Sequence, residues 1–195
     1  MGDMRETAGS RGRSTWAGGA LRELHDAARL VPDATLDALA DEILAAGRIS
    51  CTANGRELLM LRAFAMRLMH LGLDVHVAGD VTAKPLGSGD LLLVVCGPGK
   101  LATMDAMLAV GKAAGARTLV VTAQPDGETS RRADAVVHLP AQTMADDGAG
   151  SGSVLPMGTL FEWLELVFFD AVAIRLRERT GQTLDTIRAR HTNLE

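Results

Sequence analysis

Glu162 and His191 are two side chains of this 195-residue chain whose types can move protons, although a lone terminal histidine is by itself a weak candidate. Glu162 interrupts the apolar segment LFEWLELVFF, where burial would raise its pKa from about 4.3 toward neutral pH. The alternative is a structural carboxylate that is satisfied by an arginine such as Arg67. His191, in the C-terminal segment RHTNLE, has an imidazole that exchanges protons near neutral pH without further tuning.

The remaining histidines and the two cysteines fit structural roles better. The histidines lie singly in helical or strand patterns with no partner in view: His25, His70, His76 and His138. Cys51 and Cys96 end separate apolar runs and match neither a disulfide framework nor a metal-binding spacing. We therefore expect small-residue packing at Cys96, no metal, and a reducing cytoplasm as the compartment.

Composition excludes several classes of protein. The net charge is −4 and aromatic residues are scarce, which does not fit a nucleic-acid binder. Charges interrupt every apolar run well before the roughly 20 residues that a membrane span needs. We expect residues 1–12 to be a disordered tail and residues 13–195 to form a single domain.

The elements that must position these side chains alternate between two periodicities. Strand patterns cover 48–52, 74–78, 90–96, 118–122 and 135–139. Helical patterns cover 16–31, 36–44, 58–71, 101–114, 128–133, 157–179 and 184–191, and 143–153 is expected to be a flexible loop. Strands that alternate with helices predict an α/β fold, with a parallel sheet between two helical layers. Ligands of such sheets bind at the carboxyl ends of the strands, which selects the segments after Thr52, Ala78 and Cys96.

Three segments carry a resemblance to a known family: RAFAMRLMHLG at 62–72, LPMGTLFE at 155–162 and RHTNLE at 190–195. Together they closely resemble the 6-phospho-3-hexuloisomerases, which have the SIS (sugar isomerase) fold. The resemblance implies a flavodoxin-like, five-stranded α/β/α sandwich and a cofactor-free isomerisation through an enediolate. It also implies that Glu162 is the base, and that His191 is a second catalytic residue that reaches the site of a neighbouring subunit in a tetramer.

Two loops depart from the family pattern. Where the family has GAGRSG, this chain has ANGREL at 53–58, and where the family has SGSGET, it has CGPGKL at 96–101. The family serines are therefore lost, Glu57 replaces one of them, and Lys100 replaces the family's glutamate. By position, the resemblance implies these substrate-binding residues: Asn54, Gly55, Arg56, Glu57, Thr82, Cys96, Gly97, Gly99 and Lys100.

These departures disfavour phosphate binding in the family's manner. A carboxylate about 4 Å from a phosphate repels it by several kcal/mol at an effective dielectric constant of about 20. Pro98 also removes a backbone donor. Three alternatives stay open: a Glu57–Lys100 ion pair across an empty pocket, binding of an amine, a carboxylate or sugar hydroxyls, and phosphate held in a new way. Arg56 either steadies substrate oxygens or forms a salt bridge.

Two functions follow from the sequence. The first is an isomerase that acts on a sugar or sugar derivative other than the family's 6-phosphohexulose, by proton transfer without a cofactor. The alternative is a non-catalytic metabolite-binding or regulatory protein. The broad apolar face of the 157–179 helix predicts a homo-oligomer, either a dimer or a tetramer.

Overall fold

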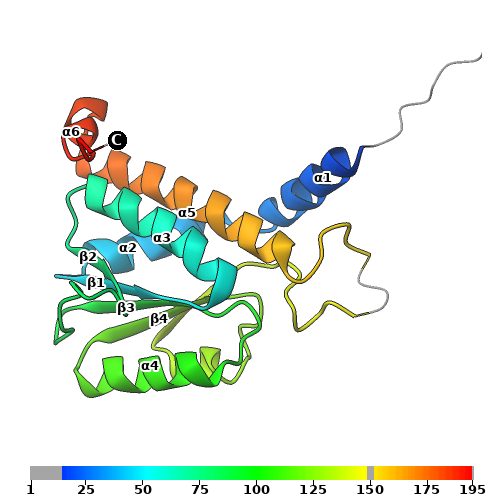
Figure 1. Cartoon of the computed structure of the whole chain (residues 1–195), viewed down its shortest axis with the longest axis horizontal. Coiled ribbons are helices and arrows are strands. Elements are labelled where there is room, and N and C mark those ends of the chain that lie inside the picture. Colours follow the sequence, from blue (N-terminus) through cyan, green and yellow to red (C-terminus); the bar gives the residue numbers. More distant parts are fainter. Residues whose placement is uncertain (1–14, 149–151, 195) are drawn as a thin grey trace, which may run out of the picture.

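A parallel sheet of five strands, in the order β2-β1-β3-β4-β5, forms the centre of the computed structural model, which describes residues 15–148 and 152–194 (Figure 1). The strands are β1 (Ile49–Thr52), β2 (Val75–Val77), β3 (Leu91–Val95), β4 (Arg117–Thr122) and β5 (Ala135–His138). The middle strand, β3, pairs with both β1 and β4 and is buried along its whole length. Its sequence LLLVV is apolar on both faces because helices cover both sides of the sheet.

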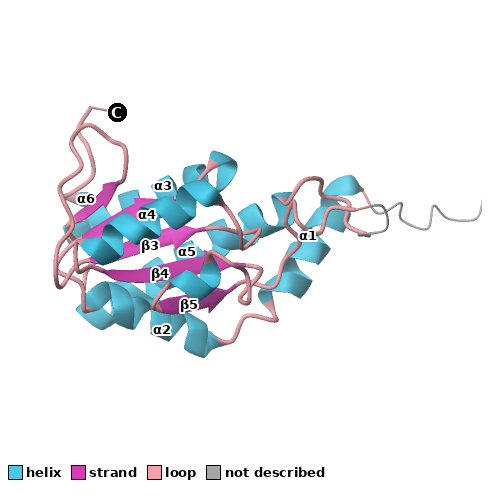
Figure 2. Cartoon of the chain, turned by 90° about the horizontal axis from the view of Figure 1, so that it is seen from below, coloured by secondary structure: helices cyan, strands magenta, loops and turns pink. Residues whose placement is uncertain are grey.

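Helices form one layer on each side of this sheet (Figures 1 and 2). One layer contains α2 (Asp33–Leu44), α3 (Gly55–His70) and α5 (Thr159–Thr180), which share the larger apolar core with one face of the sheet. The other layer is α4 (Ala102–Ala113), with a smaller core that includes Leu92, Val94 and Val120. The predicted α/β/α sandwich is therefore confirmed.

Helices α3 and α5 lie side by side and run in the same direction (Figure 1). The rings of Phe64 and Phe169 stack at 4.3 Å with their planes 3° apart, midway along the pair. Both helices therefore begin at the same edge of the sheet, which brings their first turns together.

Two further helices lie at the ends of the described chain. Helix α1 (Trp16–Ala28) packs against α5 and projects beyond the sheet, and α6 (Leu184–Arg188) follows the end of α5 (Figure 1). No helix within the described ranges is long and apolar enough to cross a membrane.

The predicted elements are all present, with two differences that matter. The helix expected from Leu58 begins at Gly55, so Arg56 and Glu57 lie in its first turn rather than in a loop. The helix expected over 128–133 is a single 3-10 turn, Ser130–Arg132. The tail expected over 1–12, and part of the loop expected over 143–153, lie outside the described residues.

Candidate active site at the sheet switch point

The strand order reverses between β1 and β3, so the segments that follow these two strands diverge and leave a crevice between them. This is the position at which open α/β sheets bind ligands. A cavity of about 200 Å³ lies there, closed on one side by the beginning of α5. It is lined by Asn54, Gly55, Arg56, Glu57, Pro98, Leu101, Thr143, Met144, Met157, Gly158, Phe161 and Glu162.

The chain enters α5 through a tight turn that fixes the direction of its first residues. Met157 has a φ of 55°, and Gly158, which precedes the helix, has a φ of 80°. Asp147 Oδ2 accepts a hydrogen bond of 2.8 Å from the backbone N–H of Met157. A left-handed methionine is unfavourable by itself, so the surrounding contacts must hold this turn at the cavity.

Arg56 and Glu162 connect the first turns of α3 and α5. Arg56 Nε lies 2.8 Å from Glu162 Oε2, as an ion pair whose angles do not make a directed hydrogen bond. The arginine side chain is half exposed, whereas the Glu162 side chain is 12% exposed. Of the two roles expected for Arg56, the structure therefore shows the salt bridge. The expected alternative partner of Glu162, Arg67, instead lies near Asp170.

Glu57 extends from α3 to the segment after β3. Its Oε1 accepts a hydrogen bond of 3.1 Å from the backbone N–H of Gly97, while its Oε2 is buried with no hydrogen-bond partner among the described residues. A Cβ at position 97 would lie 2.5 Å from Glu57 Oε1 and 2.9 Å from the ring of Phe161. Only glycine leaves room for this carboxylate.

A third carboxyl, Glu165, is more deeply buried than the other two. It is on α5 three residues after Glu162, its side chain is fully buried, and neither oxygen has a hydrogen-bond partner within the described part of the chain. Glu165 was not among the site residues predicted from the sequence. The available signal was the spacing of three residues from Glu162, because residues three apart lie on the same side of a helix.

These three carboxyls hold their protons more tightly than free glutamate. Burial raises the pKa of Glu57 to about 7, with the Gly97 hydrogen bond opposing and the charge of Glu162 adding to this shift. Burial also raises the pKa of Glu162, against the charge of Arg56. Burial raises the pKa of Glu165 well above its usual range, and the neighbouring charges of Glu57 and Glu162 raise it further.

The segment after β3 already uses most of the donors that a bound anion would need. The N–H of Gly97 donates to Glu57, that of Gly99 to the Cys96 carbonyl, and that of Leu101 to Thr129 Oγ1. Pro98 has no N–H. A phosphate therefore finds few free donors in this segment.

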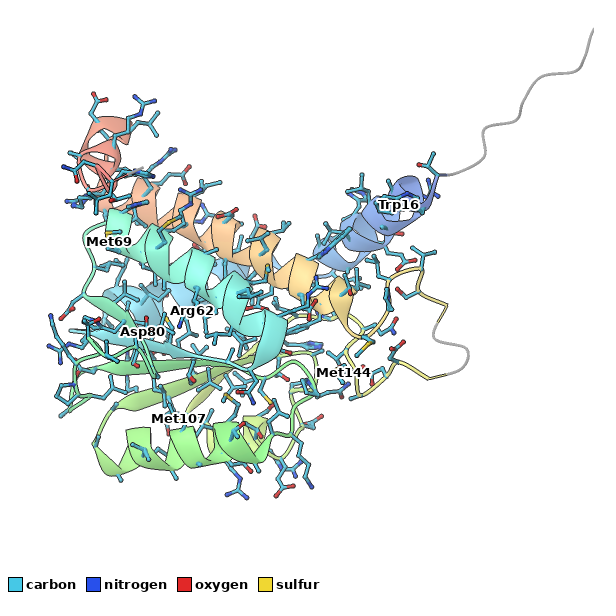
Figure 3. The ribbon with its side chains drawn as sticks, viewed as in Figure 1. Trp16, Arg62, Met69, Asp80, Met107 and Met144 are labelled. Atoms are coloured by element: carbon cyan, nitrogen blue, oxygen red, sulfur yellow. The ribbon has the colours of Figure 1, made fainter. Side chains whose placement is uncertain are left out.

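Six of the predicted site residues do not line this cavity: Gly97 and Gly99 belong to the adjacent segment after β3, and the other four are engaged elsewhere. Thr82 lines a separate cavity with Arg62, Met69 and Asp80. Figure 3 shows the labelled residues of that cavity well apart from Met144, which marks the candidate site. Cys96 is fully buried in the smaller core, as its expected packing role requires, and burial raises the pKa of its thiol to about 11.

Lys100 and His191 also lie outside the lining of this cavity. Lys100 Nζ forms an ion pair of 2.8 Å with Glu128, so the alternative of a Glu57–Lys100 pair is wrong. His191 stacks on His70 at the opposite end of α3, with ring centroids 5.2 Å apart. At a rise of 1.5 Å per residue, the 13 residues from Glu57 to His70 span about 20 Å. Within one chain, His191 is therefore remote from Glu162.

The remaining predicted residues do gather at the switch point. Asn54, Gly55, Arg56 and Glu57 line the cavity, and Asn54 Nδ2 donates to Thr103 Oγ1 at 2.6 Å. Gly97 and Gly99 shape the adjacent segment, where Gly99 has a φ of 71°. Among the described residues, no group of His, Cys, Asp and Glu side chains is arranged to hold a metal. The cavity thus combines the carboxyls of Glu57 and Glu162 with the guanidinium of Arg56, which suits proton transfer at a polar organic molecule.

The chain is similar over most of its length to several proteins named 3-hexulose-6-phosphate isomerase. It is 34% identical to a 3-hexulose-6-phosphate isomerase of Bacillus subtilis over 175 residues, which are 90% of this chain and 95% of that one. It is 39% identical to a 3-hexulose-6-phosphate isomerase of Mycobacterium gastri over 173 residues, which are 89% of this chain and 86% of that one. No protein-family model matches the sequence.

Solved structures agree with this similarity. A Methanococcus jannaschii protein with an inferred function of 3-hexulose-6-phosphate isomerase superposes with a TM-score of 0.80 and 27% identity. The superposition covers 90% of this chain and 98% of that one. The similarity thus includes both the sequence and the arrangement of the sheet and helices.

Proposed function

Because this chain belongs to the 3-hexulose-6-phosphate isomerase family of SIS-domain proteins, we propose that it is a sugar isomerase that works without a cofactor. The reaction moves a carbonyl group to the adjacent carbon of a ketose or aldose through an enediolate, or through an enediol where an acid protonates the carbonyl oxygen. Such a reaction needs a base over the C–H bond and groups that exchange protons with the two oxygens.

Glu162 is the proposed base, and its setting is the observation that carries the proposal. Its carboxyl lies at the cavity, is largely buried, and is held next to Arg56. Burial raises its pKa toward the pH at which a base is most effective, while the arginine keeps part of the population ionised.

We propose that the substrate is anchored by groups other than a phosphate bound as in the family. Glu57 occupies the donor of Gly97 that would face an anion, and the neighbouring N–H groups of Gly99 and Leu101 are engaged within the chain. Sugar hydroxyls or an amine are compatible with these groups.

The alternative, a binding or regulatory protein, is favoured by the same contact. The Glu57 carboxylate occupies the backbone N–H of Gly97 after β3. The same contact is expected in a protein that no longer converts a sugar phosphate. The two functions differ in one property, because a protein that only binds a sugar leaves its C–H protons in place.

We further propose that residues 13–195 act as one SIS domain in a homo-oligomer. Since His191 is remote from Glu162 within one chain, it contributes to catalysis only by entering the site of a neighbouring subunit. The cytoplasmic location expected from the cysteines stays a prediction, and both thiols are free and buried.

Solvent-deuterium incorporation tests the proposal. The protein is incubated in D₂O with 3-hexulose 6-phosphate, D-fructose 6-phosphate or D-fructose, and deuterium at carbon is followed by proton NMR. We expect incorporation by the wild type and a loss of at least about 100-fold in Glu162→Gln, as is typical for removal of a general base. Binding of these sugars without exchange would establish the regulatory alternative. A preference for the phosphorylated sugars, abolished by competing inorganic phosphate, would contradict the proposed anchor.

A further inference from the structure

Glu57 is a second titratable group in the cavity, and the proposed reaction does not yet use it. It lines the same cavity as Glu162, but it comes from α3 and not from α5. The two carboxyls therefore face one cavity from two separate elements, so that a bound ligand could be contacted by both.

The two oxygens of Glu57 have different environments. Oε1 is fixed by the N–H of Gly97 at 3.1 Å, which orients the carboxyl, whereas Oε2 is buried and accepts no hydrogen bond from the described residues. A carboxyl held at one oxygen and unpartnered at the other places its proton on the second oxygen. A buried polar atom without a partner is unfavourable unless a ligand supplies one.

We infer that Glu57 is the general acid of this site: a catalytic residue that protonates the substrate carbonyl oxygen while Glu162 removes the adjacent C–H proton. The inference rests on the proposed isomerase function and deepens it. It differs from the family pattern, which has a serine at this position.

Each step of this reaction balances. The Glu162 carboxylate takes the C–H proton, the C–H electron pair forms a C=C bond, and the carbonyl oxygen takes the proton of Glu57 to give a neutral enediol. The Glu57 carboxylate then removes the proton of the other hydroxyl, a new C=O bond forms there, and the C=C electrons take the proton of Glu162 at the original carbonyl carbon. Both carboxyls return to their starting states.

The charges around Glu57 favour this division of roles. On its own helix, Arg56 pairs with Glu162 and so favours the ionised form of that carboxyl. From α5, the charge of Glu162 disfavours ionisation of Glu57, the buried Glu165 keeps its proton and is neutral, and the Cys96 thiol at the end of β3 is also buried and neutral. The result is one carboxyl that favours the base form and one that favours the acid form. Two carboxyls whose surroundings favour different protonation states are typical of the acid and the base of an active site.

The first test measures Glu57 without any substrate. Protein labelled with ¹³C at the glutamate carboxyl carbons is titrated by NMR, and the Glu57 signal is assigned as the one missing from Glu57→Gln. We expect its midpoint near pH 7, as the pKa of about 7 predicts, and a lower midpoint in Glu162→Gln, because removing that negative charge makes Glu57 easier to ionise. A midpoint in the ordinary range of a free glutamate would overturn the inference.

The second test separates the two proton transfers, with the D₂O assay on 3-hexulose 6-phosphate, D-fructose 6-phosphate and D-fructose. The amide of Glu57→Gln can donate a hydrogen bond but no proton. Isomerisation should therefore fall about 10²- to 10⁴-fold, while exchange at carbon should fall less, and the decline of wild-type activity above pH 7 should disappear. The control is Glu128→Gln, which removes an exposed carboxylate paired with Lys100 outside the cavity and should keep the wild-type ratio of exchange to isomerisation.

The outcomes distinguish this inference from the proposed function. If the wild type exchanges deuterium and Glu57→Gln matches it in rate and pH profile, Glu57 is not the acid, although the isomerase function stands. If the wild type exchanges no deuterium into any of the three sugars, the isomerase function fails and the role of Glu57 fails with it.

Discussion

Arg56 Nε lies 2.8 Å from Glu162 Oε2, so the first turns of two helices more than 100 residues apart in the sequence meet at one ion pair. The pair has two effects on the site. It holds the carboxyl at the cavity, and its positive charge opposes the increase in the Glu162 pKa that burial causes. The arginine therefore controls how much of the proposed base is ionised at a given pH.

Replacing Arg56 by glutamine should move the acid limb of the pH profile to higher pH. Without the guanidinium, the pKa of Glu162 rises further, and a base that must be ionised to act becomes active only at higher pH. The measurement is kcat/KM for exchange or isomerisation between pH 5 and 9. Arg62→Gln is a matched control, because Arg62 is on the same helix and pairs with Asp80 at a separate cavity. An acid limb that stays in place in Arg56→Gln would show that the ion pair does not tune the base.

Alanine at position 97 should disturb both stability and the Glu57 carboxyl. The new Cβ would lie 2.5 Å from Glu57 Oε1 and 2.9 Å from Phe161, so one of these side chains must move. We expect a loss of about 1–3 kcal/mol, measured by denaturant unfolding. Gly148→Ala is the control, because its Cβ would meet nothing within 4 Å. Adding Glu57→Ser to Gly97→Ala should recover part of the loss, and no recovery would mean that the Phe161 contact alone causes it.

The sequence predicted the sheet and the positions of nearly all helices because hydrophobic periodicity determines which segments become buried. The run LLLVV is typical of a strand covered on both faces, and RAFAMRLMHLG lies in a helical pattern, and both predictions are confirmed. The location of the site followed from the rule for the carboxyl ends of parallel strands. These features depend on local pattern and topology, which a single sequence contains.

The partners of charged side chains were not predictable in the same way. An ion pair between Glu57 and Lys100 was one of the alternatives expected from the sequence. Lys100 instead pairs with Glu128, because a lysine on a surface loop has several acidic neighbours within reach. Glu165 was overlooked because its burial depends on how closely α3 and α5 approach the sheet. Such pairings depend on tertiary distances of a few ångströms, which periodicity does not specify.

The wild-type protein should become less stable as pH rises, and Glu165→Gln should weaken that dependence. A carboxyl with a raised pKa in the folded state binds its proton more tightly there than in the unfolded chain. The free energy of unfolding therefore decreases as pH rises above the pKa that the group has in the unfolded chain. For Glu57 the window runs from 4.5 to about 7, with a loss of about 3 kcal/mol across it. Glu165 adds to the decline, because burial raises its pKa well above its usual range.

The measurement for this prediction is the melting temperature between pH 5 and 9. Glu178→Gln provides the control, since this side chain is exposed on the same helix. We expect Glu165→Gln to melt higher than the wild type at pH 9 and to differ less at pH 5. A wild type whose melting temperature rises steadily from pH 5 to 9 would refute the buried, protonated state of these carboxyls.

The outer sides of α3 and α5 should form an interface between copies of this chain. Five apolar side chains of these helices are more than 40% exposed: Leu59, Met66, Met69, Val167 and Ile174. Such a surface favours self-association, and a neighbouring subunit is also what His191 needs in order to reach a site that is about 20 Å away within its own chain. Sedimentation should therefore show a dimer or tetramer for the wild type and a smaller species for Ile174→Glu. Val110→Glu, at an exposed apolar residue of α4 on the other face of the sheet, should keep the wild-type state.

Mixing two inactive variants tests whether that assembly shares its sites. If Glu162 and His191 act from different subunits, Glu162→Gln and His191→Ala each inactivate the protein when pure. After the two are unfolded and refolded together, some sites in the mixed oligomers combine an intact Glu162 with an intact His191, so part of the activity returns. A pure His191→Ala protein with full activity would instead show that the site is complete within one chain, which leaves Glu57 and Glu162 as its proton carriers.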